Sequence, residues 1–114
     1  REGEEILSER ATQLLGGMLV KTVDNGYSGR ARVPGYFVAG KSGTAEIAEQ
    51  GSYSKTYNHS FIGYAPVDNP RFVMLVKYEK PERAYAESTA APVFGELSKF
   101  ILEYYQVAPQ RAVK

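Results

Sequence analysis

The chain has 114 residues, the usual size of one domain, with 43% apolar residues, 24% charged residues and a formal net charge of +1. So small a charge argues against binding of nucleic acid, and the absence of cysteine excludes disulfides and thiolate metal sites. The lone His59 cannot build a metal site without several carboxylates near it, so neither a metal nor another cofactor is expected.

The first predicted element is an amphipathic helix from Ile6 to about Asp24. Apolar residues recur in it at the spacing of one helix face, at Leu7, Ala11, Leu14, Leu15, Met18 and Leu19. Gly16 and Gly17 lie inside this helix, where each costs up to about 1 kcal/mol relative to alanine. They therefore predict that another part of the protein approaches the helix closely there. Residues 25–36 contain Gly26, Gly29, Pro34 and Gly35, and we expect a loop.

Three strands are predicted to follow. Residues 37–48 alternate small and apolar positions, and residues 57–65 show an alternating aromatic and β-branched pattern. Between them, the polar, glycine-containing residues 49–56 predict a loop. Residues 71–78 form a continuous apolar run, RFVMLVKY, which predicts a strand buried on both faces. The turn formers of residues 66–70 indicate a hairpin between the last two strands.

The chain is predicted to end as it begins, with an amphipathic helix. Residues 81–89 are expected to form a loop, and an apolar stripe of helical period then runs from Pro92 to Tyr104. Residues 109–114 are expected to be frayed. Short connections favour an antiparallel three-stranded meander, so we predict a single α+β domain with the order α-β-β-β-α.

The first strand contains an unusual stretch, VAGKSGTAEIA, at residues 38–48. A buried ammonium or hydroxyl group without a partner costs several kcal/mol. Lys41, Ser42 and Thr44 therefore indicate either an ordinary edge strand that faces water or a strand that presents polar groups to a ligand. Glycine allows a backbone to approach a ligand closely, and hydroxyl and ammonium groups can bind an anion. Four residues alone leave both interpretations open.

The wider context resembles a known family. Lys-Ser-Gly-Thr at residues 41–44 resembles the K-[ST]-G box of the penicillin-recognising serine transpeptidases. VPGYFVAGKSGTAEIA, SFIGYAPVDNPRFVMLV and AAPVFGELSKFIL follow in the order seen in class B penicillin-binding proteins, and they cover most of residues 33–105. The cell-division type looks slightly closer than the elongation type. The resemblance implies a β-lactamase/transpeptidase-like fold.

The resemblance also implies roles for the box residues. Lys41 would support the proton network around a nucleophile. Ser42 and Thr44 would bind the carboxylate of a D-alanyl-D-alanine stem peptide or of a β-lactam. The backbone N–H of Thr44 would be one of two oxyanion-hole donors. Gly43 would keep the strand open to substrate.

No credible nucleophile accompanies the box. The family places an S-x-x-K motif on a helix far earlier in the chain, whereas the one S-x-x-K here, Ser52 to Lys55, follows the box. In a chain of this composition, the number of S-x-x-K matches expected by chance is about one half. We therefore reject this match as a nucleophile and its base. Residues 1–114 are therefore expected to be the C-terminal part of a single transpeptidase domain, and the chain alone is expected to be inactive. Its partners would be the N-terminal part of the domain, the stem peptide and β-lactams.

Two other functions stay open. The chain could be a non-catalytic structural or partner-binding module that retains the box, or part of a β-lactamase or β-lactam sensor. The resemblance implies the periplasmic face of the bacterial cytoplasmic membrane. No run of eighteen apolar residues occurs, so any membrane anchor is expected outside this chain. His59 is expected to be a hydrogen-bonded structural residue.

Overall fold

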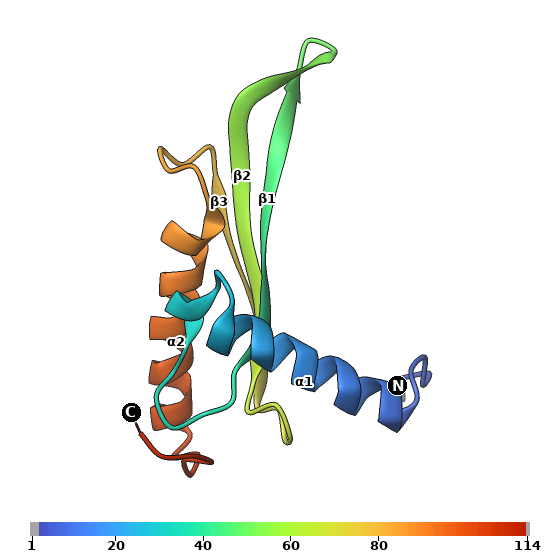
Figure 1. The fold of residues 1–114 in the computed structure, drawn as a ribbon, viewed down its shortest axis with the longest axis vertical. Helices are drawn as coiled ribbons and strands as arrows, with labels where there is room; N and C mark the ends of the chain where they lie inside the picture. The colour runs from blue at the N-terminus through green and yellow to red at the C-terminus, as the bar shows by residue number, and fades with distance from the viewer. Residues whose placement is uncertain (1–2, 114) are drawn as a thin grey trace.

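The computed structural model describes residues 3–113, and its helices and strands follow the predicted order (Figure 1). The elements are α1 (Glu9–Asn25), η1 (Gly29–Ala31), β1 (Ala39–Glu49), β2 (Ser52–Ala65), β3 (Phe72–Glu79), η2 (Ala86–Ser88) and α2 (Ala90–Tyr104). The strands form one antiparallel sheet in the order β1-β2-β3. The predicted α+β meander is confirmed.

Helix α1 begins at an N-cap serine, because the Ser8 hydroxyl accepts a hydrogen bond from the Ala11 N–H at 3.2 Å. The helix crosses one end of the sheet and extends beyond it (Figure 1). A Cβ atom on Gly16 would lie 3.0 Å from Val67 Cγ2, whereas one on Gly17 would meet nothing within 4 Å. The predicted close approach is therefore confirmed at Gly16 and wrong at Gly17.

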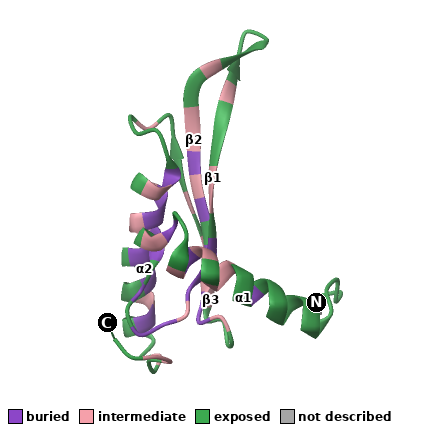
Figure 2. Ribbon diagram, in the orientation of Figure 1, coloured by how far each residue is buried: buried purple, intermediate pink, exposed green. Residues whose placement is uncertain are grey.

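Helix α2 covers one face of the sheet. Its fully buried Phe94 packs against Phe61 of β2, with ring centroids 4.6 Å apart, and against Phe72 of β3, at 6.5 Å. Figure 2 shows the buried residues gathered on α2 and on the strand segments that face it. Pro92 lies in the first turn of α2, as predicted. The hydrophobic core thus lies between α2 and the sheet.

The opposite face of the sheet is open, and we call it the open face. Val73 and Leu75 of β3 are 72% and 61% exposed, and their neighbour Ile62 of β2 is 52% exposed. The prediction that β3 is buried on both faces is wrong for this chain. Within residues 3–113, α2 covers only the face to which the half-buried side chains of β3 point.

The β1–β2 hairpin is longer than predicted. Residues 49–56 do not form a loop, because β2 already begins at Ser52. Only Gln50 and Gly51 separate the two strands, and their φ angles of 51° and 82° are the left-handed values that a two-residue hairpin turn requires. The hairpin consequently projects well beyond β3 (Figure 1).

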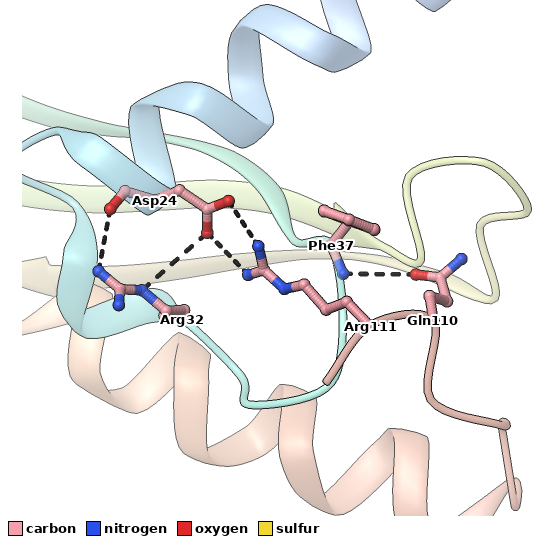
Figure 3. Close-up of polar contacts among 5 residues, drawn as sticks. All are labelled: Asp24, Arg32, Phe37, Gln110 and Arg111. Carbon is pink, nitrogen blue, oxygen red and sulfur yellow. Dashed lines mark hydrogen bonds and ion pairs between the residues drawn. The ribbon is translucent and has the colours of Figure 1, made fainter. Parts of the chain in front are cut away.

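The C-terminal tail is anchored rather than frayed as far as residue 113, so that prediction is also wrong there; residue 114 lies outside the described residues. Two guanidinium nitrogens of Arg111 donate to the two carboxylate oxygens of Asp24 at 2.7 and 2.8 Å (Figure 3). The same guanidinium lies 4.5 Å from the ring centroid of Phe37. The Gln110 side chain accepts a hydrogen bond from the Phe37 N–H at 3.3 Å. These contacts join the tail to the end of α1 and to the segment that leads into β1.

Candidate functional site

The residues of the box lie on β1, at the edge of the sheet. One side of β1 pairs with β2, and no strand among residues 3–113 pairs with its other side. An edge strand presents unpaired backbone groups to which an extended ligand can bind. The strand placement predicted for Lys41 to Thr44 is therefore confirmed.

The register divides the box between the two faces of the sheet. Ser42 pairs with Phe61, and Thr44 pairs with His59. Since cross-strand partners share a face, Ser42 and Thr44 lie on the face that carries α2. Lys41 pairs with Ile62 and therefore lies on the open face. The structure brings the four residues together along one edge, but it does not direct all their side chains to one face.

Lys41 is exposed, and its ammonium group donates to the Ser42 carbonyl oxygen at 2.8 Å. No carboxylate of residues 3–113 lies within ion-pair distance of it. The ammonium charge is thus not neutralised by the described part of the chain, and two of its three N–H donors remain available to an anion.

Packing within the sheet constrains Gly43 of the box and Gly40, which precedes the box. A Cβ atom on Gly43 would lie 2.7 Å from Ser60 Oγ, and one on Gly40 would lie 2.6 Å from the Phe61 ring. Both distances are too short for non-bonded atoms. Close packing is therefore one reason for these glycines, in addition to the access for substrate that the sequence suggests for Gly43.

Thr44 contacts the short helix η2. Thr44 is an exposed residue, and its side-chain hydroxyl accepts a long hydrogen bond from the Ala86 N–H, at 3.4 Å. A threonine hydroxyl has one proton to donate and two lone pairs to accept. Thr44 can therefore remain bonded to Ala86 and still donate its proton to a ligand oxygen.

His59 of β2 is the cross-strand neighbour of Thr44 on the same face of the sheet and is fully buried. Its Nδ1 lies 2.9 Å from Thr89 Oγ1, which confirms the expected hydrogen-bonded histidine. Sequence reasoning missed Ala86 and Thr89, because both lie in a segment predicted to be only a loop. A signal was present in Pro92, since this residue has no N–H with which to bond a threonine hydroxyl three positions earlier.

Ser52 and Lys55 cannot act as a nucleophile and its base in this structure. They lie on β2 rather than in the predicted loop, and the Ser52 hydroxyl donates to the Glu49 carbonyl oxygen at 3.4 Å. Residues three apart share a face on a helix but point to opposite faces of a strand. The rejection of this S-x-x-K match therefore has a geometric reason.

Within residues 3–113, no group of three or more histidine, cysteine, aspartate or glutamate residues could hold a metal ion. Across the same residues, no helix combines the length and the apolar composition needed to cross a membrane.

Residues 1–99 match the family described as "Penicillin binding protein transpeptidase domain". The chain belongs to this family. Stage V sporulation protein D of Bacillus subtilis is 33% identical over 112 residues, which cover 95% of this chain and 17% of the relative. The probable peptidoglycan D,D-transpeptidase PbpC of Pseudomonas aeruginosa is 40% identical over 83 residues, or 70% of this chain and 15% of the relative. The suggested resemblance to class B penicillin-binding proteins is confirmed.

The fold agrees with solved transpeptidase domains. The transpeptidase domain of penicillin-binding protein 3 from Burkholderia pseudomallei superimposes with a TM-score of 0.86 at 34% identity, over 96% of this chain and 34% of that domain. The β-lactamase/transpeptidase-like fold is thereby confirmed. The chain spans about a third of this solved domain and less than a fifth of the two curated relatives.

Proposed function

We propose that residues 1–114 are the C-terminal part of a serine D,D-transpeptidase domain that cross-links peptidoglycan and is acylated by β-lactams. In this proposal, β1 forms the wall of the cleft that binds the substrate carboxylate. The observation that supports it is that Lys41, whose ammonium no described carboxylate neutralises, Ser42 and Thr44 lie along one unpaired sheet edge in a chain of this family.

Each box residue has a chemical role in this proposal. The hydroxyls of Ser42 and Thr44 donate to the terminal carboxylate of a D-alanyl-D-alanine stem peptide or to the carboxylate of a β-lactam. Lys41 stabilises that negative charge and the proton network of the nucleophile. The N–H of Thr44 donates to the oxyanion, a contact whose removal costs about 3–4 kcal/mol in a well-studied hydrolase.

The nucleophile is a serine outside residues 1–114. Its oxygen attacks the carbonyl carbon of the penultimate D-alanine, an acyl-enzyme forms, and the terminal D-alanine leaves with a proton on its amine. An amine of a second stem peptide then attacks the ester and regenerates the serine. The reaction needs no cofactor. It takes place at the periplasmic face of the cytoplasmic membrane, with any anchor outside this chain.

The proposal is tested by measuring acylation by a fluorescent penicillin in the full gene product that contains this segment. Lys41→Ala and Ser42→Ala should each lower the second-order rate constant by about 10- to 100-fold, the effect of losing a hydrogen bond to a charged group. Lys55→Ala and Ser52→Ala are matched controls on β2 and should stay within about twofold of the parent.

All four variants should keep the parent's unfolding temperature to within a few degrees, which separates chemistry from folding. An unchanged rate in Lys41→Ala and Ser42→Ala, or loss of acylation in Ser52→Ala, would contradict the proposal.

A further inference from the structure

A buried polar contact lies next to Thr44, on the same face of the sheet. His59, on the α2 face of β2, is the cross-strand partner of Thr44 and is fully buried. Its Nδ1 lies 2.9 Å from Thr89 Oγ1, and its Nε2 has no hydrogen-bond partner among the described residues. Within residues 3–113, the ring is therefore oriented by one polar contact, the one with Thr89.

The Thr89 hydroxyl is available for this contact because it does not cap its own helix. Thr89 is the N-cap residue of α2, and an N-cap threonine hydroxyl usually accepts from the N–H of the second or third helical residue. The third helical residue here is Pro92, which has no N–H, and Thr89 makes no side-chain capping bond. Its hydroxyl bonds to His59 instead.

Thr89 is in turn connected to the box. Its backbone N–H donates to the Ala86 carbonyl oxygen at 3.2 Å, which closes the turn of η2. The Ala86 N–H donates to Thr44 Oγ1 at 3.4 Å. Since Thr44 faces His59 across the strand pair, these contacts form a closed ring of four residues: Thr44, His59, Thr89 and Ala86.

We propose that His59 is a positioning residue for Thr44. Through Thr89 it fixes η2 against β1, and η2 holds the Thr44 hydroxyl and the strand around it in the geometry that binds the carboxylate. An apolar ring would fill the same space, and at a lower desolvation cost than imidazole, but could not fix η2. The inference rests on the proposed function of Thr44.

Two matched pairs of variants separate the hydrogen bond from side-chain packing. Asparagine places a polar atom near the position of Nδ1, whereas glutamine places one near Nε2. His59→Asn therefore keeps a partner for Thr89, and His59→Gln does not. Thr89→Ser keeps the hydroxyl, and Thr89→Val replaces it with a methyl group of similar size.

Two measurements are made on the full gene product: the penicillin acylation rate, separated into noncovalent affinity and maximal rate, and deuterium exchange in residues 40–46. His59→Gln and Thr89→Val should lower the rate constant at least about tenfold and increase exchange in residues 40–46. His59→Asn and Thr89→Ser should stay within about threefold of the parent, with unchanged exchange.

A lower unfolding temperature in His59→Gln and Thr89→Val with unchanged acylation per folded molecule would overturn the inference, because it would show a structural role only. Slower acylation with unchanged exchange in residues 40–46 would also overturn it. If the histidine variants do not fold, the Thr89 pair alone decides between these outcomes. Failure of the proposed function is visible separately, as normal acylation in Lys41→Ala and Ser42→Ala.

Discussion

At some positions of the sheet, residues from distant parts of the sequence leave room for glycine but not for a larger residue. A Cβ atom on Gly63 of β2 would lie 2.5 Å from the Ala39 carbonyl oxygen and 2.8 Å from Phe94 Cζ. The first neighbour belongs to the backbone of β1 and the second to the core under α2. Neither can move without disturbing the edge strand or the helix that support the box.

Gly63→Ala should therefore lower the free energy of unfolding by about 1–3 kcal/mol, the usual effect of overpacking a core. Gly17→Ala is the control, because a Cβ atom there meets nothing within 4 Å and alanine favours a helix by about 1 kcal/mol. Chemical denaturation of the full gene product measures both. Equal stability of Gly63→Ala and the parent would show that the strands separate more easily than this packing indicates.

At this scale the sequence was informative about the box but not about its surroundings. Lys41, Ser42 and Thr44 are recognisable because polar groups at those positions in an otherwise apolar strand need an explanation. The contacts of Ala86 and Thr89 with the strands could not be predicted, because they join residues 42 and 30 positions apart along the chain. A pattern within one segment carries no information about which distant segment will contact it.

The order of the strands and both helices could be predicted from hydrophobic periodicity and connection length. The position of the β1–β2 turn and the anchoring of the C-terminal tail could not. The β1–β2 turn uses Gln50 and Gly51, and glutamine is a weaker turn signal than asparagine or aspartate. The C-terminal tail was expected to be frayed because the last residues of a domain are often poorly ordered. It is instead held by the contacts of Arg111 with Asp24 and Phe37.

The Asp24–Arg111 pair should make stability depend on pH. Hydrogen bonds from Arg111 lower the pKa of Asp24 below its ordinary value of 3.8, partial burial opposes this, and the charges of Arg111 and Arg32 add to the lowering. A lowered pKa in the folded state gives stability that is full above pH 3.8 and is lost as the pH falls through the folded-state pKa.

Asp24→Asn should thus cost about 1–2 kcal/mol at neutral pH, and the difference from the parent should shrink as the pH falls below the ordinary carboxyl pKa. Urea denaturation at a series of pH values measures this difference. Glu79→Gln is the control, because Glu79 pairs with Lys77 at an exposed position and should have a much smaller effect. A difference between Asp24→Asn and the parent that does not change with pH would contradict the assignment.

In the whole molecule, one face of the sheet is covered by α2 and the other face is open. Helix α2 and the core hold the sheet from behind, whereas the open face presents Ile62, Val73 and Leu75 together with the Lys41 side chain. Contiguous exposed apolar residues commonly mark a surface that another part of a protein covers. This agrees with a chain that spans about a third of a solved transpeptidase domain.

We propose that this segment binds and polarises the substrate but does not attack it. The most direct test is to react the full gene product with a penicillin and to locate the acyl group by mass spectrometry of its peptides. We predict that the acyl group is on a serine outside residues 1–114. An acyl group on any serine within these residues, Ser52 included, would contradict the account.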